Sequence, residues 1–343
     1  MIRIQNIYYM LAYAFQVLHE QGYKDVATEA FENTAELLSA ILCRGVSVQI
    51  KRGLCRQYIT NEEPLGSPRG KIEIGESIKT QAIRKKQLVC AYDEFSVDAY
   101  TNRIIKTTME LLLRANISKT RKKEIRKLLI FFDGVSVLDT HSINWDIQYD
   151  RNNQTYRMII EVCHLVIKGL LQTSADGSTR IMDYADDQTM AKLYEKFILG
   201  YFQREHTDIK AYSPQIAWQV TDGYRTLLPT MQSDIVISNK KTKKTLIIDA
   251  KYYSHNMQMK APYMTQTLHS GNLYQIFTYV KNWNAAPDET ISGMLLYART
   301  DDAIQPDNDY QMSGNQISVK TLDLNCEFAV IAAQLDAIAD SIK

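Results

Sequence analysis

The first part of the chain has apolar residues at the spacing of three and four positions that is typical of helices. One such series covers residues 4–18, and Gly22 is expected to end that helix. A second helix is predicted over residues 28–44, with Gly45 at its end. Two helices are therefore expected before any strand.

After Gly45 the spacing of apolar residues changes to every second position, which is typical of strands. Val46, Val48 and Ile50 follow this rule, and the prolines and glycines of residues 61–70 predict a loop. Four short strands are expected here, at residues 46–50, 54–58, 71–74 and 88–95. Residues 46–95 should thus form a small, mostly β unit with exposed hairpins.

Helical spacing returns in the middle of the chain, over residues 97–116, 118–131 and 155–171. Ser118 is a good N-cap, because its hydroxyl can accept a hydrogen bond from the first turn of the helix. The helix after Ser118 is strongly basic, and its basic residues form either a solvated face or a surface for phosphates. These residues are Lys119, Arg121, Lys122, Lys123, Arg126 and Lys127.

A polar, turn-rich segment at residues 150–154 indicates a domain boundary, which we place between residues 152 and 153. Residues 1–152 are predicted to be an α+β domain, and residues 153–343 a mixed α/β domain. After a loop at residues 173–179, helices are expected at 190–202, 272–283 and 328–338, and strands at 217–220, 227–238, 245–253, 292–298 and within 310–319.

Composition excludes several classes of protein. The net charge of +1 provides no global attraction to nucleic acid, so any DNA contact requires local basic patches or a partner. The five cysteines have no CxxC spacing, which argues against a disulfide framework and a zinc site. We expect a cytoplasmic protein without a signal peptide or a membrane span. The motif GxxxxGK[ST] is absent, so the chain is not expected to bind a nucleotide as a motor.

Candidate chemistry lies on two predicted neighbouring strands. Asp234 opens the first strand, and Asp249 follows the apolar run of the second. Because side chains alternate along a strand, Asp249 and Lys251 share a face while Ala250 points away. Two such carboxylates can bind Mg²⁺ together with the Ala250 carbonyl, waters and a phosphate oxygen. The pattern predicts a metal-dependent phosphodiesterase.

Other residues are expected to support this site. Lys251 either orients the attacking water or neutralises developing charge, and it can act as a base only if its pKa is lowered. Glu195, on the preceding helix, is either a further metal ligand or a solvated residue. Gln275 and Tyr279 lie one turn apart on the following helix, where they can support the metal ligands or hold the scissile strand. Tyr279 also fits a position in the core.

Four lysines occupy the turn between the two acidic strands: Lys240, Lys241, Lys243 and Lys244. They form either a solvated hairpin tip or a clamp on the DNA backbone near the proposed metal site. His255 and His269 lack the spacing of metal ligands, and we interpret them as surface or substrate-proximal residues.

The order of the predicted elements is similar to the core of the PD-(D/E)xK nuclease fold. A helix comes first, then two acidic strands, a second helix and a further strand. The sequence QIFTY at residues 275–279 also resembles the Q-x-x-x-Y helix of one branch of these nucleases. A restriction-endonuclease-like fold is therefore expected for residues 153–343.

Longer segments resemble the McrC family, the nuclease subunits of the McrBC modified-cytosine restriction systems. They are IQNIYYMLAYAF, DEFSVDAYTNRIIKTTMELL, LLPTMQSDIVI, TLIIDAKYY, SGNLYQIFTYV and GMLLYA, in family order over nearly the whole chain. The resemblance implies that the family's Asp…Asp-x-Lys motif corresponds to Asp234, Asp249 and Lys251. An acid at Glu195 is not a fixed feature of the family, so its role stays open.

The resemblance also implies partners. McrC-like proteins dock through their N-terminal domain onto McrB, a hexameric AAA+ GTPase, and stimulate its GTP hydrolysis. The hairpins at residues 46–75 would be the docking part. McrB binds GTP, recognises double-stranded DNA with modified cytosine and translocates it, and McrC cuts both strands, with a McrC dimer as one way to do so. Two alternatives remain, a non-catalytic adaptor with a relict nuclease fold and a stand-alone repair or recombination nuclease.

Overall fold

The structure is a computed structural model of the chain, in which residues 2–15, 31, 33–149, 153–176, 187–260 and 265–343 are described. The chain divides into two compact units, one of Met1–Leu37 and Gln172–Lys343 and the other of Leu38–Leu171. We refer to them as the sheet unit and the helical unit. Within the described ranges, no helix is both long enough and apolar enough to cross a membrane.

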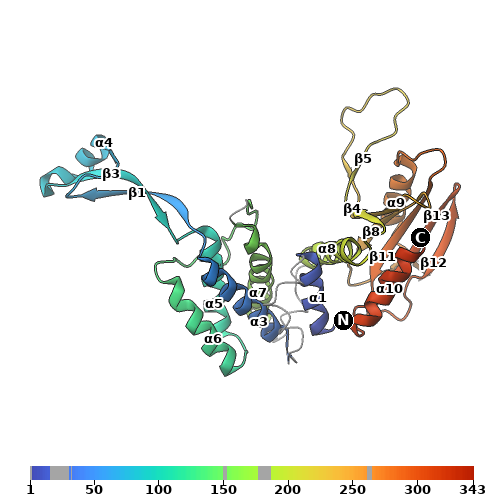
Figure 1. The fold of residues 1–343 in the computed structure, drawn as a ribbon, viewed down its shortest axis with the longest axis horizontal. Coiled ribbons are helices and arrows are strands. Elements are labelled where there is room, and N and C mark those ends of the chain that lie inside the picture. Colours follow the sequence, from blue (N-terminus) through green and yellow to red (C-terminus); the bar gives the residue numbers. More distant parts are fainter. Residues whose placement is uncertain (1, 16–30, 32, 150–152, 177–186, 261–264) are drawn as a thin grey trace. The chain divides into compact units, whose positions relative to one another are not determined.

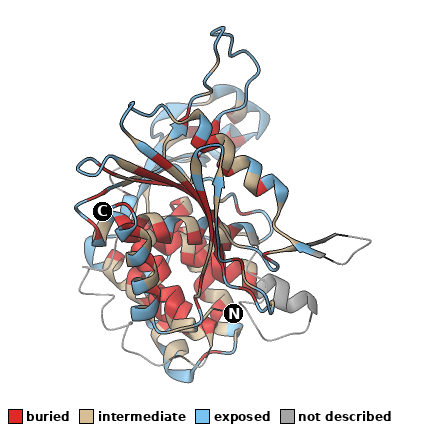
Figure 2. Cartoon of the chain, turned by 90° about the vertical axis from the view of Figure 1, so that its right-hand side faces the viewer, coloured by how far each residue is buried: buried red, intermediate tan, exposed pale blue. Residues whose placement is uncertain are grey.

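The sheet unit is built on a six-stranded mixed sheet with the order β12-β13-β11-β8-β7-β4 (Figure 1). Its strands are β4 (Lys210–Tyr212), β7 (Ile235–Asn239), β8 (Lys244–Lys251), β11 (Thr290–Ala298), β12 (Asn308–Met312) and β13 (Asn315–Leu322). β4, β7 and β8 pair antiparallel, β8, β11 and β13 pair parallel, and β12 is antiparallel to β13. The parallel strands β8 and β11 are buried along most of their length, which matches their nearly continuous apolar sequences (Figure 2).

Helices cover both faces of this sheet. α9 (Ser270–Asn282) packs on one face, where Ile247 and Leu295 belong to the same apolar cluster as Ile276 and Val280. A Cβ on Gly293 would lie 2.8 Å from side-chain atoms of both Ile276 and Val280, so this glycine allows α9 to approach β11. Helices α8 (Asp187–Glu205) and α10 (Phe328–Asp340) lie on the other side of the sheet.

The first helix, α1 (Ile4–Ala14), packs on α8 through a close approach of the two backbones. A Cβ on Gly200 would lie 2.3 Å from the carbonyl oxygen of Tyr13. The predicted domain boundary at residues 152/153 does not match the division into units. α1 belongs to the sheet unit because of this packing, and α7 (Arg157–Asp176) belongs mostly to the helical unit.

The helical unit contains a three-stranded antiparallel sheet with the order β1-β3-β2. Its elements in chain order are α3 (Thr34–Arg52), β1 (Gln57–Leu65), β2 (Lys71–Ile72), α4 (Ile74–Lys79), η1 (Ala82–Lys85), β3 (Leu88–Ser96), α5 (Tyr100–Arg114), α6 (Lys119–Leu129), η2 (Ile130–Phe132), η3 (Gln154–Tyr156) and α7. The small β unit is thus confirmed, but it begins at Gln57 and not at Val46. Ser118 caps α6, since its Oγ accepts a hydrogen bond from the Arg121 amide.

The strand predicted at residues 46–50 is wrong, because α3 continues to Arg52. Ile41, Leu42, Gly45, Val46 and Gln49 are buried, which is the spacing of one helix face. Burial of this face outweighs the local preference of Val46 and Val48 for strands.

Part of the loop predicted at residues 61–70 is also wrong, since β1 extends to Leu65 in register with β3. Pro64 is tolerated because β1 pairs with a single strand, so the missing amide disrupts no second ladder.

In the sheet unit, the helices predicted at residues 190–202, 272–283 and 328–338 are confirmed, as are the strands at 245–253 and 292–298. The strand predicted at 217–220 is wrong. The long strand predicted at 227–238 is replaced by β6 (Met231–Gln232), which pairs with β5 (Gln215–Ile216), and by β7. A second short pair is formed by β9 (Gln258–Lys260) and β10 (Thr265–Thr267).

Three predictions fall partly outside the described residues. The loop expected at 173–179 is helical up to Asp176, the end of α7, and residues 177–179 are not described. The ends of the first two predicted helices, at residues 16–18 and 28–30, also lie outside the described part.

Candidate active site

Asp234 and Asp249 lie side by side at one end of the antiparallel pair β7 and β8. The register pairs Ile235 with Ile248, which places Asp234, just before β7, opposite Asp249. Asp234 Oδ2 accepts a hydrogen bond of 2.8 Å from the amide of Ala250. The two carboxylates predicted from the sequence are therefore neighbours. The hydrogen bond from the Ala250 amide holds Asp234 against the backbone of β8.

The Asp249 side chain is completely buried, with 0% of its surface exposed. Neither of its carboxylate oxygens receives a hydrogen bond of good geometry from the described residues, although the Lys251 ammonium lies 2.7 Å from Oδ2 as an ion pair. A buried carboxylate with so few donors is costly unless another cation binds to it. The burial of Asp249 without good hydrogen-bond donors is therefore the strongest indication that this site binds a ligand.

A line of hydrogen bonds runs from Lys251 along α9. Lys251 Nζ donates to Gln275 Oε1 (3.2 Å), and Gln275 Nε2 donates to Tyr279 Oη (2.8 Å). Tyr279 in turn donates to the carbonyl oxygen of Gln232 in β6 (3.0 Å). Gln275 and Tyr279 thus fix the position of the Lys251 ammonium. Tyr279 is also buried in the core of the sheet unit, so the two interpretations of Tyr279 are compatible.

Glu195, on α8, is half-buried and interacts electrostatically with the three residues of the site. Burial raises the pKa of the Glu195 carboxyl; the Lys251 ammonium opposes this rise, and the charge of Asp249 adds to it. Since a solvated surface acid would show no such effect of burial, the position of Glu195 favours a part in the site.

The pKa values of Glu195, Asp234 and Asp249 are all raised, mainly by burial, so ionisation of these acids is disfavoured. Burial raises the pKa of Asp234 from 3.8 to about 8, and the charges of Asp249 and Glu195 contribute to the rise. Burial also raises the pKa of Asp249, although Lys251 opposes it. For Lys251, burial is the largest single effect and lowers the pKa, but the charge and hydrogen bond of Asp249 and the charge of Asp234 together outweigh burial, so the pKa is raised and the side chain is an ammonium at neutral pH.

The donor set fits a hard divalent cation, because the side chains at the site offer carboxylate oxygens, two of which lack good donors. No group of three or more histidine, cysteine, aspartate or glutamate side chains gathers as a metal cluster within the described ranges. Mg²⁺ retains several waters and binds through one or two carboxylates, so it fits a site with two adjacent aspartates better than Zn²⁺ does.

The four lysines of the β7–β8 turn do not lie near the carboxylates, which corrects the expectation that they flank the metal site. The turn joins the opposite ends of the strands, because Asn239 pairs with Lys244. Lys244 and Asp249 are five positions apart in β8, or about 16 Å along a strand. Lys243 pairs with Asp288, and Lys244 donates to the carbonyl oxygens of Ser341 and Lys343.

His255 and His269 lie beyond the end of β8 that carries Lys251. His255 is exposed, and its Nδ1 lies 3.0 Å from Asp302 Oδ1. His269 contacts the ring of Tyr253, and its Nε2 lies 3.4 Å from the His255 carbonyl oxygen. His255 is thus a surface residue and His269 is half-buried; whether either lies close to a substrate stays a prediction.

Sequence reasoning missed a tyrosine–asparagine network next to Lys251. Tyr297 of β11 is in register with Lys251, and its hydroxyl accepts a hydrogen bond of 2.9 Å from Asn272 Nδ2. Asn272 Oδ1 accepts a hydrogen bond from Tyr253 (3.3 Å). These residues come from the segment just after β8, from α9 and from β11, and no motif spacing relates them, so only the folded chain brings them together.

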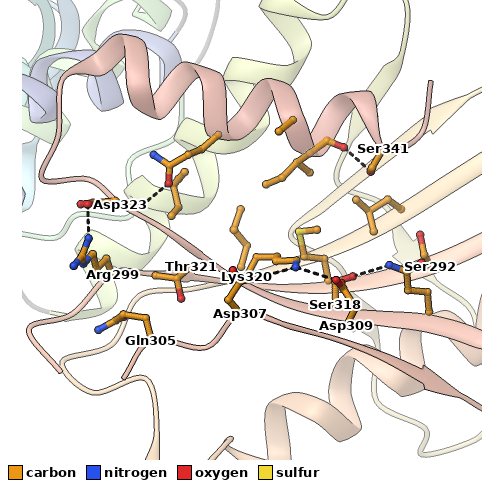
Figure 3. Close-up of a pocket in the computed structure, with 18 of the residues that line it drawn as sticks. Ser292, Arg299, Gln305, Asp307, Asp309, Ser318, Lys320, Thr321, Asp323 and Ser341 are labelled. Atoms are coloured by element: carbon orange, nitrogen blue, oxygen red, sulfur yellow. Dashed lines mark hydrogen bonds and ion pairs between the residues drawn. The ribbon is translucent and has the colours of Figure 1, made fainter. Parts of the chain in front are cut away.

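A cavity of about 900 Å³ lies away from these carboxylates, between α10 and strands β11 and β13 (Figure 3). Its floor includes Leu246 and Leu296, which point to the sheet face opposite α9. At its rim Lys320 pairs with Asp307 and Asp309, and Arg299 pairs with Asp323. Because the charged groups at this rim are already paired, the cavity offers no free charge for catalysis.

Comparison with known proteins gives a consistent result. A family profile described as "McrBC 5-methylcytosine restriction system component" matches residues 4–298. The chain is 30% identical, over 99% of its own length and 97% of the relative, to the Type IV methyl-directed restriction enzyme EcoKMcrBC of Escherichia coli strain K12.

Two solved structures from Thermococcus gammatolerans are also similar to this chain. One is a refined half-complex from a tetradecameric assembly of McrB AAA+ hexamers with bound McrC, with 17% identity, a TM-score of 0.48, and coverage of 99% of this chain and 76% of that chain. The other is a cryo-EM structure of the McrBC complex, with 18% identity, a TM-score of 0.37, and coverage of 49% and 55%.

Proposed function

Because this chain belongs to the family of McrBC 5-methylcytosine restriction system components, we propose that it is the Mg²⁺-dependent endonuclease subunit of such a system. The relative from Escherichia coli is named as a methyl-directed restriction enzyme, which supports hydrolysis of DNA phosphodiester bonds. The substrate would be double-stranded DNA that carries modified cytosine.

The observation that carries the proposal is the pair of adjacent carboxylates with a lysine held beside it. Asp234 lies just before β7, and Asp249 and Lys251 lie at the end of β8, where Lys251 bonds to Gln275 of α9. The order α8, β4, β7, β8, α9 and β11, with β11 parallel to β8, supports a PD-(D/E)xK fold for the sheet unit. A relict fold would have no reason to keep a fully buried aspartate without good hydrogen-bond donors.

In the proposed reaction, Asp234 and Asp249 hold Mg²⁺, with the Ala250 carbonyl as a further ligand and Glu195 as a candidate one. When bound, the metal lowers the pKa of a water and stabilises charge on the phosphate. Asp249, which pairs with the Lys251 ammonium in the structure, would share its carboxylate between the lysine and the metal. The Lys251 ammonium would neutralise the charge that develops on the phosphate oxygens.

Lys251 does not act as the base in this mechanism. A general base needs a lowered pKa, whereas the ion pair with Asp249 raises the pKa of Lys251. Gln275 and Tyr279 are positioning residues. Gln275 accepts a hydrogen bond from the ammonium, and Tyr279 orients the amide of Gln275.

Exposed apolar side chains on the small β unit of the helical unit favour the binding of a protein partner. Tyr58 and Phe95 lie opposite each other on β1 and β3, with ring centroids 5.0 Å apart, and they are 74% and 52% exposed. Ile74, Ile78 and Ile83 are also more than half exposed. Large apolar side chains exposed to water are typical of binding surfaces, and we propose that this small β unit docks a McrB-type AAA+ GTPase hexamer.

The test is a plasmid cleavage assay that varies methylation, Mg²⁺, GTP and the AAA+ partner. Cleavage that requires all four supports the proposal. Stimulated GTP hydrolysis without any cleavage would indicate an adaptor, and cleavage by the isolated chain without GTP would indicate a stand-alone nuclease. The Asp249→Asn variant is the control, and undiminished cutting by this variant would overturn the assignment of the site. Sedimentation of the complex on DNA would reveal whether two copies of this chain act together.

A further inference from the structure

The segment between β5 and β6, residues 217–230, is an unusual surface loop of the sheet unit. Residues 221–230 are exposed without interruption, and the segment has no helix or strand of its own. Figure 1 shows it standing out from the rest of the sheet unit, next to the labels of β4 and β5. We refer to residues 217–230 as the β5–β6 loop. A loop of this length without secondary structure is uncommon unless it has a function.

The tip of the β5–β6 loop is apolar, although it is surrounded by water. The exposed fractions of Tyr224, Leu227 and Leu228 are 67%, 96% and 40%. Leu227 also has a positive φ of 68°, a left-handed conformation that a leucine adopts at a cost in energy. Leu227 therefore has an unfavourable backbone conformation, and its apolar side chain is exposed to water. This combination is typical of binding elements.

The base of the same loop is firmly fixed. Trp218 Nε1 donates to the carbonyl oxygen of Pro229 (2.6 Å), which ties the two arms together. The Gln219 amide donates to Asn282 Oδ1 on α9 (2.8 Å). A loop with a closed base and an exposed tip presents its apolar side chains in a defined direction, so less conformational entropy is lost when they bind.

This anchoring connects the β5–β6 loop to the proposed active site. Gln275, Tyr279 and Asn282 lie on one face of α9, since they are four and three residues apart. Gln275 binds Lys251, Tyr279 binds the Gln232 carbonyl at the second end of the loop, and Asn282 binds Gln219 near its first end. β6 then leads within two residues to Asp234. A substrate bound at the carboxylates therefore lies beside the loop.

We propose that the β5–β6 loop contacts duplex DNA and that Leu227 acts as an apolar wedge at a base step beside the cut. This inference rests on the proposed nuclease function. Each arm of the loop has about seven residues and so a maximum reach of about 20 Å, more than the depth of a DNA groove of about 8 Å. Asp222 and Arg225 cancel in charge, so the tip is suited to apolar insertion and not to a phosphate clamp. Leucine is among the side chains that proteins insert between base pairs.

The experiment uses the full-length chain carrying Asp249→Asn, so that DNA is bound but not cut, with and without the AAA+ partner and GTP. The probe is a short methylated duplex with 2-aminopurine, whose fluorescence rises when a base is unstacked. Leu227→Gly and Leu227→Ser remove the wedge; glycine adopts the positive φ without strain, so loss of folding cannot explain its effect. Val330→Ser is the control, because Val330 is another exposed apolar residue of the sheet unit, 50% exposed on α10.

We expect both Leu227 variants to lose the rise in fluorescence and to bind the duplex about tenfold more weakly, the effect of one buried leucine side chain. Val330→Ser should behave as the parent does. Unchanged fluorescence and affinity in Leu227→Gly would overturn the inference and leave the nuclease proposal standing, provided that the chain with Asp249 intact still cuts. A DNA-free dimer that Leu227→Gly dissociates would overturn it in favour of a second copy as the occupant. Absence of cutting by the intact chain under all conditions would overturn both proposals.

Discussion

Replacement of Asp234 by asparagine should stabilise the metal-free protein, and the gain should grow with pH. Asparagine has the shape of aspartate, and its Oδ1 can still accept the Ala250 amide hydrogen bond. The substitution therefore removes the charge while it keeps the local geometry. Burial and the neighbouring acids oppose that charge and raise the pKa of Asp234 to about 8.

The sign follows from proton binding. Between about pH 4 and pH 8 the folded protein keeps a proton on Asp234 that the unfolded chain has released, so the free energy of unfolding falls as pH rises through this window. At 1.36 kcal/mol per pKa unit, the shift from 3.8 to about 8 would correspond to about 5 to 6 kcal/mol if Asp234 titrated alone. Because Asp249 and Glu195 share the repulsion and relax when Asp234 changes, we expect a gain of about 2 kcal/mol at alkaline pH.

The assay is urea unfolding followed by circular dichroism, at about pH 5 and about pH 8.5, with and without Mg²⁺. Mg²⁺ should stabilise the parent by about 2.7 kcal/mol at one hundred times its dissociation constant, and should have little effect on Asp234→Asn. Asp133→Asn, at an exposed position of the helical unit, is the control. Equal stability of parent and Asp234→Asn at the higher pH, or equal stabilisation of both by Mg²⁺, would refute the electrostatic account of the site.

Three further predictions concern separate parts of the molecule. Lys251→Met should reduce cleavage by at least about a hundredfold, because the lysine neutralises charge on the phosphate. Mg²⁺ should still stabilise this variant, because the lysine does not hold the metal. A Lys251→Arg variant that cuts normally would show that only the charge is needed. The double variant Tyr58→Ser and Phe95→Ser should abolish stimulation of the partner's GTPase, measured by phosphate release, without a change in cleavage-site geometry or folding, and retained stimulation would exclude this surface as the docking part. Gly293→Ala should destabilise the sheet unit by about 1 to 3 kcal/mol in thermal unfolding, because the added Cβ would overpack α9 against β11; Gly271→Ala, where a Cβ meets no atom within 4 Å, is the control.

Local patterns predicted much of the fold because some elements depend mainly on their own residues. The apolar stripe of α8, the helix α9 and the buried strand β11 were all apparent from spacing. The strand prediction at residues 46–50 failed for the opposite reason. Val46 and Val48 favour a strand, but the buried face of α3 repeats at helical spacing, and Gln49 on that face donates to the carbonyl oxygen of Thr155, which is distant in the sequence.

The candidate site divides in the same way. The spacing of Asp234, Asp249 and Lys251 was enough to identify adjacent strands, because an antiparallel pair joined by a short turn is a local structure. The distance between the lysine turn and the carboxylates was misjudged, since a hairpin places its turn and its open ends at opposite ends of the strands. The hydrogen bonds from Lys251 through α9 to β6 needed the tertiary structure.

The sequence by itself was enough to predict the family, the three central residues of the candidate site and most helices and strands of the sheet unit. Only the tertiary structure decided that Asp249 is fully buried, that Gln275 accepts a hydrogen bond from Lys251 and is oriented by Tyr279, and that both ends of the β5–β6 loop are bonded to α9, the helix that carries Gln275. The physical reason is that burial and electrostatics are sums over neighbours in space, and most of those neighbours are distant in the chain. The sequence shows which chemical groups are present, and the packing of α9 on the sheet determines which neighbours each group contacts.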